Sequence, residues 1–398
     1  MTYPGMTYLG MKGWGVRFLH TADWQLGMTR HFLDDDAQPR YSAARREVVA
    51  GLGALAAETG AEFVVVAGDV FDANQLAPDV ISQSLEAMRS ITIPVFLLPG
   101  NHDSLEAGSV YTSALFLREC PQNVTVLDRA GVWPVRPGVE LVAAPWRSKR
   151  PTSDLAAAVV DDLPADGTIR VLVAHGGVDL LAPNKDEPAL IKLAPLAAAI
   201  DRGAVHYVAL GDKHSRKQVD QGGRIWYSGS PEVTNYDDVE EDPGHVLIVD
   251  IDEDDSGHPV TVNNRHIGRW RFVTLTRQLD GGDDIADLNR DLDALMDKER
   301  TVIQLALTGT LTVTDFAALE DCLESNRRRF ACIDTWERNT NLAVLPADGE
   351  FEDLGLSGFA AAALDELVEM ARSSIGEVAA DAQGALALLT RLAKGGQG

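Results

Sequence analysis

Short apolar runs that stop at a turn carrying Asp, Asn, Gln or His are the feature that most constrains how this chain can fold. Five such turns occur between residues 16 and 214, namely Asp23 and Gln25 in HTADWQLG (20–27), GDVFD (68–72), GNHD (100–103), HG (175–176) and GDKH (211–214). Alanine-rich stretches with helical periodicity separate several of the runs. Strands that alternate with helices predict an α/β domain. The carboxyl ends of its strands lead into one crevice, so we expect these side chains to meet.

The same pattern gives the expected elements up to about residue 266. Strands are expected at Val16–His20, Glu62–Ala67, Ile93–Leu98, Glu140–Ala144, Ile169–Ala174, Val205–Leu210, Arg224–Tyr227 and His245–Ile251. Helices are expected at Ala43–Thr59, Pro78–Ser90 and Pro188–Ala199. Closely spaced strands between residues 205 and 266 indicate an added antiparallel part, so the sheets should be mixed.

The rhythm changes after about residue 270, where a small β-α-β-α-β unit is expected. Its elements are expected at Trp270–Leu275, Ile285–Glu299, Val302–Leu307, Asp315–Asn326 and Ala331–Trp336. A polar, glycine-containing stretch over residues 346–358 precedes two amphipathic helices, expected at Phe359–Ser373 and Glu377–Lys394. These two helices either pack on the body of the protein or dock another chain.

Composition predicts a soluble cytoplasmic protein. Of the 398 residues, 45% are hydrophobic, which is enough for a packed core. No apolar run approaches the ~20 residues that cross a bilayer, so we expect no membrane contact. Residues 1–15 lack the pattern of a secretory signal and are expected to be a loose leader. The scattered cysteines (Cys120, Cys322 and Cys332) indicate neither a disulfide framework nor a thiolate zinc site, which fits a reducing compartment.

Charge limits the partners that this chain can bind. The formal net charge is −25, so the average field of the protein repels a phosphate backbone. We interpret the acidic runs at 34–36, 237–242 and 252–255 as solvated loops. Basic clusters occur at 147–150, 213–217 and 327–329. A nucleic acid would therefore have to bind at such local patches or with the help of a partner.

The order of the turn motifs resembles the calcineurin-like metallophosphoesterases. The stretches HTADWQLG, VVAGDVFD, LLPGNHDS and YSGSPEVTNYDD are similar to the SbcD-like branch of DNA repair exonucleases, from residue 16 to about 250. The resemblance implies a four-layer α/β/β/α sandwich of two mixed sheets over residues 16–266. It also implies an α/β capping domain at 267–345, then a linker and C-terminal helices at 346–398 that could dock an ATPase.

The resemblance also implies a set of site residues around two divalent ions. Asp23, Gln25 and His214 would bind one ion, and Asp69 would bridge both. Asn101, His175 and Asp212 would complete the second site, while His102 would support the leaving group or the transition state. Asp72 and Asp103 either fix the loops and orient an imidazole or simply cap turns. His20 is expected to pack in or beside the sheet.

Two of these positions depart from the family pattern, because Gln25 and Asp212 stand where D-x-H and G-H-x-H have histidine. One interpretation is a degenerate, inactive site. The other is that amide and carboxylate oxygens still bind metal and favour hard cations, Mn²⁺ first and Mg²⁺ second. Three carboxylates against two dications would leave about one net positive charge for a phosphate.

Three functions follow from this resemblance. The first is a Mn²⁺-dependent hydrolase that cuts DNA phosphodiesters, as the nuclease subunit beside an SbcC-like SMC-family ATPase. SbcD-like proteins tend to dimerise, so a homodimer is included in this hypothesis. The second is a metallophosphoesterase for small nucleotide substrates. The third is a catalytically silent partner of such an ATPase.

Overall fold

The computed structural model describes residues 15–182, 184, 187–252, 259–344, 358–373, 378, 381–382, 384–386 and 388–389. The chain divides into two compact units. The first holds the described residues up to Arg30 together with Gln38–Asn235 and Val239–Trp270, and the second holds His31–Ala37, Tyr236–Asp238 and the described residues from Arg271 onward. Within the described residues, no helix is both long and apolar enough to span a bilayer.

Two mixed sheets form the first unit. One has the strand order β12-β11-β1-β2-β3-β4, with bounds Val260–His266, His245–Ile251, Val16–Thr21, Phe63–Val66, Val95–Leu97 and Val124–Val126. The other has the order β5-β6-β7-β8-β10-β9, with bounds Gly131–Arg136, Val139–Ala144, Ile169–His175, Tyr207–Gly211, Ile225–Tyr227 and Lys217–Gln218. The helices are α1 (Ala37–Thr59), α2 (Pro78–Arg89), α3 (Ala114–Glu119), α4 (Ala157–Val160) and α5 (Leu193–Asp201), with a 3-10 turn at Val110–Thr112.

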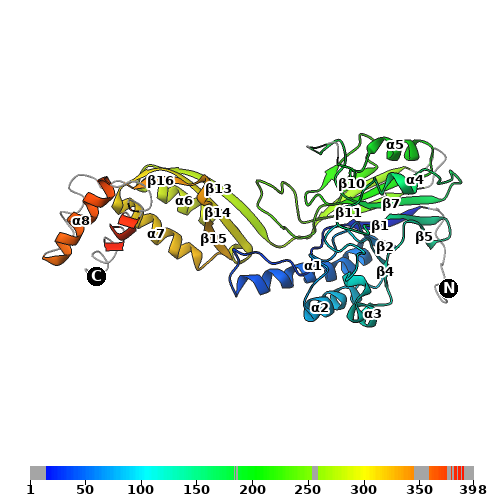
Figure 1. The fold of residues 1–398 in the computed structure, drawn as a ribbon, viewed down its shortest axis with the longest axis horizontal. Coiled ribbons are helices and arrows are strands. Elements are labelled where there is room, and N and C mark those ends of the chain that lie inside the picture. Colours follow the sequence, from blue (N-terminus) through cyan, green and yellow to red (C-terminus); the bar gives the residue numbers. More distant parts are fainter. Residues whose placement is uncertain are drawn as a thin grey trace. The chain divides into compact units, whose positions relative to one another are not determined.

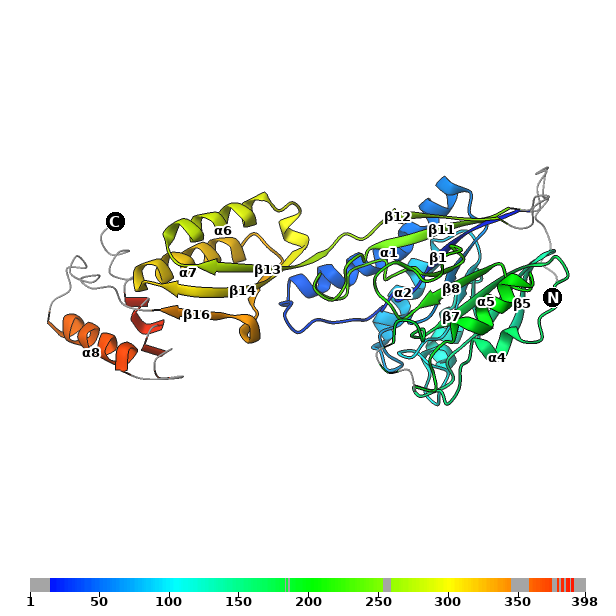
Figure 2. The ribbon, with the colours of Figure 1, turned by 90° about the horizontal axis from the view of Figure 1, so that it is seen from above.

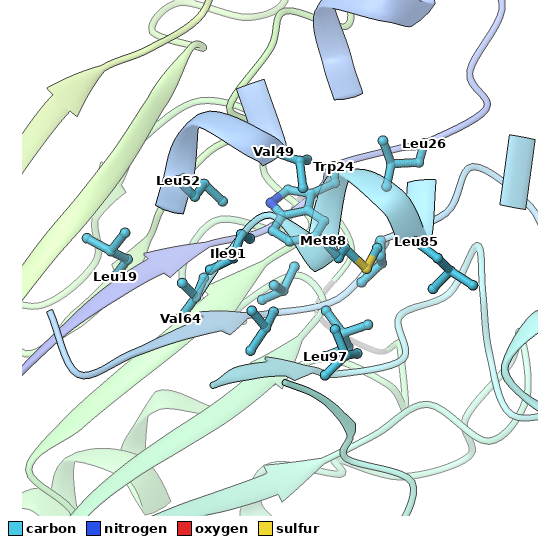
Figure 3. Packing of buried hydrophobic residues seen from close by; sticks show 14 of the residues in the cluster. Leu19, Trp24, Leu26, Val49, Leu52, Val64, Leu85, Met88, Ile91 and Leu97 are labelled. Carbon is cyan, nitrogen blue, oxygen red and sulfur yellow. The ribbon is translucent and has the colours of Figure 1, made fainter. Parts of the chain in front are cut away.

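The outer face of the first sheet packs against α1 and α2. In a strand, successive side chains point to opposite faces, so alternate residues of β1, β2 and β3 share this face. Figure 3 shows the result, with Leu19, Val64 and Leu97 of the sheet packed against Val49, Leu52, Leu85 and Met88 of the helices. Trp24, in the loop after β1, fills the same cluster, so the loop that carries Asp23 and Gln25 is fixed to the core.

The intervening side chains of the same strands face the second sheet. Phe18, Phe63 and Val65 pack against residues of β6, β7 and β8, among them Leu141 and Val171, in the cluster between the sheets. The far face of the second sheet is covered by α4 and α5. Figure 1 shows these layers from α2 and α3, through the two sheets, to α4 and α5. The prediction of a four-layer α/β/β/α arrangement with two mixed sheets is confirmed.

Parallel pairing of the strands brings the loops with the predicted turn motifs to common edges of the sheets. Strands β1, β2, β3 and β4 run parallel to one another, as do β6, β7, β8 and β10. The turn motifs found in the sequence follow β1, β2, β3, β7 and β8 at their carboxyl ends. Strands β7 and β2 are buried along their whole length, which explains their continuous apolar runs.

The second unit is a small α/β fold. Its elements are β13 (Arg271–Leu279), α6 (Gly282–Ala294), a 3-10 turn (Lys298–Arg300), β14 (Thr301–Leu311), α7 (Val313–Arg327), β15 (Cys332–Thr335), a 3-10 turn (Glu337–Asn339), β16 (Asn341–Val344) and α8 (Phe359–Ser373). Strand β14 pairs in parallel with β13, β15 and β16. Figure 2 shows α6 and α7 along one face of this sheet, where Leu288 and Leu292 of α6 and Leu319 and Leu323 of α7 form the core with β14.

Sequence patterns located most elements, and the misses are short or at helix ends. Strands β4, β5, β9 and β16 and the short helices α3 and α4 were not predicted, and β12 was expected only as an unassigned strand before residue 266. Helix α1 begins at Ala37 instead of Ala43, and the carboxylate of Asp34 accepts the backbone N–H of Ala37 at 2.7 Å. Helix α8 has the predicted bounds. The helix predicted at Glu377–Lys394 lies mostly outside the described residues.

Candidate metal centre

A buried cluster of metal-binding side chains lies where strands of the two sheets of the first unit end. One ligand atom from each of Asp23, Asp69 and His175 lies within 4.8 Å of the other two, and all three residues are buried. Asp23 and Asp69 follow β1 and β2 of the first sheet, and His175 ends β7 of the second. Carboxylate oxygen and imidazole nitrogen are ligands for divalent cations, so the cluster is a candidate metal centre.

The backbone at this centre is held in an uncommon conformation. Among the described residues, five non-glycine residues have positive φ, and four of them belong to the predicted ligand set: Asp23 (52°), Gln25 (46°), Asp69 (50°) and Asp212 (103°). Such residues cost about 1–3 kcal/mol each and persist where the surrounding structure enforces them. Backbone hydrogen bonds from Asp23 to Gly68 and from Gln25 to Asp69, both 3.0 Å, lock the loops after β1 and β2 together.

Two glycines allow the loops to approach this closely. A Cβ atom on Gly100 would lie 2.2 Å from Oδ1 of Asp69, and one on Gly68 would lie 2.1 Å from Nδ1 of His175. Neither position can therefore carry a side chain without displacing a candidate ligand. The glycines in the GDVFD and GNHD motifs are required by packing as well as by the turns.

Gln25 offers a buried side-chain oxygen to the centre. Its side chain is fully buried, and its Nε2 donates a hydrogen bond to Oδ2 of Asp69 at 3.0 Å. Its Oε1 is buried and has no hydrogen-bond partner among the described residues. A buried unpaired carbonyl oxygen costs about 1–3 kcal/mol, and a bound cation would remove that cost. The residues present therefore fit a hard divalent cation at this position.

The surroundings of His175 also favour a bound positive charge. Its Nε2 lies 2.7 Å from Oδ1 of Asn101, and its Nδ1 lies 2.9 Å from the carbonyl oxygen of Ala67. Burial alone would lower its pKa, but the charges of Asp69, Asp23 and Asp212 raise the pKa to about 10. In the protein without metal, a proton on His175 partly neutralises the carboxylates. The Ala67 carbonyl would keep Nδ1 protonated when Nε2 binds a cation.

The two buried carboxylates have different pKa values. Burial raises the pKa of Asp23 to about 6, although His214 and His175 oppose this change. Burial also acts to raise the pKa of Asp69, but His175 and His102 outweigh it and lower the pKa to about 2. Asp69 accepts hydrogen bonds from Gln25 and from the backbone N–H of His102, which lies 2.9 Å from Oδ1. It is the central acceptor of the cluster.

The predicted ligands Asp212 and His214 lie beside this cluster. The backbone N–H of Asp212 donates to both carboxylate oxygens of Asp23, at 3.2 and 3.1 Å. The carboxylate of Asp212 lies outside the buried cluster, with 29% of the side chain exposed and Oδ2 3.7 Å from Nζ of Lys213. His214 is held through Nδ1, which donates to Oε1 of Glu240 at 2.8 Å.

His102 stands at the solvent edge of the centre. Its side chain is 43% exposed, and its Nε2 lies 3.9 Å from Oδ2 of Asp69. Its Nδ1 donates to the backbone carbonyl of Asp72 at 2.8 Å, so the main chain of Asp72 orients the ring. An imidazole that is fixed at one nitrogen and exposed at the other can donate a proton to a bound substrate.

Asp103 is buried beneath the centre and joins its loops. Its carboxylate accepts the backbone N–H of Gly100 at 2.7 Å and that of Phe71 at 3.1 Å, and it accepts the hydroxyl of Tyr111 at 2.6 Å. Burial and the charge of Asp69 raise its pKa to about 6. The geometry therefore places Asp103 as a support for both loops.

Sequence reasoning missed two residues that position candidate ligands. Glu240 belongs to the acidic run at 237–242, and the interpretation of that run as a solvated loop is wrong at this residue, which is only 3% exposed. It was missed because nothing in an acidic run distinguishes a buried carboxylate. Trp146 is the other, since its Nε1 donates to the carbonyl of His175 at 2.6 Å. Its only signal was its position after an apolar run.

His20 packs between the sheets, as predicted, and does not face the centre. Its Nδ1 lies 2.9 Å from the hydroxyl of Tyr207, and its Nε2 lies 3.2 Å from the carbonyl of Leu210. Burial lowers its pKa to about 3, with a smaller opposing effect of the Leu210 carbonyl. His20 is therefore a neutral core residue.

Comparison with known families agrees with this architecture. The sequence profile of the calcineurin-like phosphoesterase family matches residues 16–249, which is more than half of the chain. The chain belongs to the calcineurin-like phosphoesterase family. The predicted family is thereby confirmed, and this membership classes the chain among the metal-dependent hydrolases of phosphate esters.

Among individual relatives of this phosphoesterase is the SbcD component of the SbcCD nuclease of Rhodobacter capsulatus. It is 26% identical over 380 residues, which covers 79% of this chain and 86% of the relative. The DNA double-strand break repair protein Mre11 of Archaeoglobus fulgidus is 33% identical over 91 residues, covering 22% of this chain and only 19% of that protein.

Solved structures of low sequence identity also align with the chain. TT1561 of Thermus thermophilus is 13% identical with a TM-score of 0.37, covering 63% of this chain and 98% of that protein. A dimetal phosphatase of Danio rerio is 12% identical with a TM-score of 0.38, covering 62% and 98%. At these TM-scores the likeness carries no argument about function.

Proposed function

We propose that this chain is a Mn²⁺-dependent phosphodiesterase that hydrolyses DNA, as the nuclease subunit beside an SMC-like ATPase in an SbcCD-like repair complex. The observation that carries the proposal is the buried cluster of Asp23, Asp69 and His175, beside an oxygen of Gln25 that has no hydrogen-bond partner in the described part of the chain. The relative named as a component of the SbcCD nuclease, aligned over most of both chains, supports the choice of DNA and of the partner. Such a complex would work in the cytoplasm, and the proposal includes a homodimer of this chain.

The chain's own residues would divide the work at the centre. Asp23, Gln25 and His214 would hold one cation and Asn101, His175 and Asp212 the other, with Asp69 between them. When bound, a pair of divalent cations supplies a hydroxide near neutral pH and neutralises charge on the phosphate.

The two nitrogens of His102 have separate tasks. Its Nδ1 is held by the carbonyl of Asp72, so its exposed Nε2 is free to protonate or stabilise the leaving oxygen. A group in this role contributes about 10²–10⁴-fold to the rate. The ring therefore acts on the substrate and does not ligate a cation.

The donor set supports Mn²⁺ as the metal in use. The amide oxygen of Gln25 and the carboxylate of Asp212 replace two imidazoles of the family pattern, and oxygen donors suit Mn²⁺ and Mg²⁺ better than zinc. The partly exposed carboxylate of Asp212 instead favours the silent-partner alternative, because it lies outside the buried cluster. Activity measurements on DNA separate these two candidates.

The direct test is hydrolysis of linear duplex DNA by the purified chain with Mn²⁺, alone and with the ATPase. Asp69→Asn removes the central carboxylate at nearly constant shape, and Asp201→Asn neutralises an exposed aspartate of α5 as the matched control. We expect Mn²⁺-dependent cleavage that D69N abolishes and D201N preserves. Cleavage of small nucleotides but not of DNA would favour the second hypothesis, and no hydrolysis of any phosphodiester would leave the silent partner.

A further inference from the structure

The loop that follows β6 carries a dense basic segment, Arg147-Ser148-Lys149-Arg150, which we call the basic loop. All four of its residues are exposed. In a chain whose net charge is −25, three cations within four residues form a local exception to the repulsive field.

The basic loop is anchored to the metal centre by the residue before it. The backbone N–H of Trp146 donates to the carbonyl of Pro99 at 3.1 Å, and its carbonyl accepts the N–H of Leu105 at 2.9 Å. Trp146 thus pairs with both ends of the loop that carries Asn101 and His102. Its indole also donates to the carbonyl of His175 and lies edge-on to that ring, with centroids 6.1 Å apart.

The topology gives the same placement independently. Strand β6 pairs in parallel with β7, and Ala144 at the end of β6 lies opposite Ala174, the residue before His175. The basic loop therefore leaves the sheet at the same edge as His175. A substrate with its reacting phosphate at the centre would extend neighbouring phosphates over this edge.

The basic loop differs from the other two basic clusters in its ion pairs. In the cluster at 213–217, Lys213 and Arg216 face Asp212 and Asp242 at 3.7 and 2.7 Å, and among the described residues only Lys217 of its Lys and Arg side chains forms no ion pair. The cluster at 327–329 is likewise paired, with Glu324 and Asp293. Among the described residues, Arg147, Lys149 and Arg150 form no ion pair; Arg147 donates to the backbone carbonyl of Asp128 at 3.3 Å.

We propose that the basic loop binds backbone phosphates of the DNA next to the scissile bond. This inference rests on the proposed function, because it assigns a contact to the same substrate. Exposed, unpaired Lys and Arg side chains beside a phosphodiesterase centre supply contacts that position a strand without reading its sequence. They also offset the repulsion of the acidic body at the place where the strand must enter.

The test measures how DNA binding by the full chain depends on salt concentration, in the presence of EDTA. The fluorescence anisotropy of a labelled linear duplex reports the binding. The variant replaces Arg147, Lys149 and Arg150 by alanine. Each lost phosphate contact lowers the slope of log affinity against log salt by about 0.9. If the variant lacks three contacts, it loses less affinity than the wild type when salt rises from about 50 to about 200 mM. The loss is then about 40-fold smaller in the variant.

The control is the double variant Arg89→Gln and Arg118→Gln, on α2 and α3. Its slope of log affinity against log salt should differ from that of the wild type by less than about 0.9, the contribution of one phosphate contact. Hydrolysis of bis(p-nitrophenyl) phosphate with Mn²⁺ reports the centre separately, because this small diester has no neighbouring phosphate for the loop to bind. We expect the alanine variant to retain that hydrolysis. The charge-preserving variant Arg150→Lys should keep the wild-type slope.

Four outcomes would overturn the inference, and three of them come from the variants. These are a wild-type salt slope in the alanine variant, an equal change in the control, and a parallel loss of small-diester hydrolysis that assigns the loop to support of the centre. A wild type that binds no DNA at about 50 mM salt would overturn it as well. If the wild type hydrolyses no phosphodiester but its DNA binding still depends on the loop, the proposed function fails while the loop assignment stands.

Discussion

Replacement of Glu240 by glutamine should weaken metal binding at the centre without unfolding the protein. Glu240 is buried, its Oε1 accepts the Nδ1–H of His214 at 2.8 Å, and its Oε2 accepts the backbone N–H of Thr234 at 2.9 Å. Burial would raise the pKa of Glu240, but the hydrogen bond and charge of His214 outweigh it and lower the pKa. The ionised carboxylate keeps the proton of His214 on Nδ1 and leaves Nε2 available to a cation.

The size of the effect follows from this arrangement. An amide of the same shape keeps the backbone contact to Thr234 through its oxygen. It loses the hydrogen bond that the Thr234 hydroxyl donates to Oε1, and it removes the charge that makes Nδ1 of His214 the protonated nitrogen. Loss of such a support to a ligating histidine lowers metal affinity by about 10–100-fold. That range corresponds to about 1.4–2.7 kcal/mol of binding free energy.

Isothermal titration with Mn²⁺ measures this change, and Glu241→Gln is the matched control because the neighbouring glutamate is exposed. We expect E240Q to bind one Mn²⁺ about 10–100-fold more weakly and E241Q to match the wild type. Urea unfolding in EDTA separates a loss of ligand orientation from a loss of fold. Wild-type affinity in E240Q would refute the role of Glu240, as would an affinity loss matched by unfolding of the metal-free protein.

Three further variants test other parts of the account. His20→Gln should make the fold less sensitive to acid. The pKa of His20 is 6.5 in the unfolded chain and about 3 in the folded protein, so the free energy of unfolding falls as the pH drops through this window. The wild type should lose about 3 kcal/mol more than H20Q between about pH 6.5 and pH 4 in urea titrations. Gly100→Ala should cost about 1–3 kcal/mol of stability and weaken Mn²⁺ binding, because its Cβ would lie 2.2 Å from Oδ1 of Asp69. Gln25→His should raise the affinity for Zn²⁺ relative to Mn²⁺ in competition titrations, because imidazole is the softer ligand.

Each of these expectations has a contradicting result. Equal pH dependence in H20Q and the wild type would show that His20 is not the buried neutral base. The control for G100A is Gly51→Ala, since a Cβ there meets nothing within 4 Å and should stabilise α1 by about 0.5–1 kcal/mol. Similar behaviour of the two alanine variants would remove the packing argument. An unchanged Zn²⁺ to Mn²⁺ ratio in Q25H would place Gln25 outside the coordination sphere.

The family resemblance was sufficient for the layers, and the pattern of strand ends was sufficient for the convergence of the centre. Apolar runs that end at Asp23, Asp69 and His175 predict strands with these residues at their carboxyl ends, and parallel pairing brings such ends together. Strands such as β16 were missed because four residues give too little periodicity, and the parallel partner of β16 is more than 25 residues earlier in the chain.

Side-chain direction could not be predicted from spacing. Asp212 has the predicted place in the chain, yet at φ 103° its backbone N–H faces Asp23 and its carboxylate lies partly exposed near Lys213. Asp is enriched among non-glycine residues with positive φ, but this enrichment does not tell which Asp of a sequence adopts that conformation. Glu240 was missed for a related reason, since its hydrogen bonds to Thr234 and His214 leave no mark in the acidic run that contains it.

The most direct measurement is an anomalous difference map from crystals grown with Mn²⁺, with data collected at the manganese absorption edge. We predict a pair of peaks that share Asp69, one beside Asp23 and Oε1 of Gln25 and the other beside Nε2 of His175. A map without a peak among these residues, in crystals that hold Mn²⁺ in solution, would contradict the metal centre and with it the proposed hydrolysis.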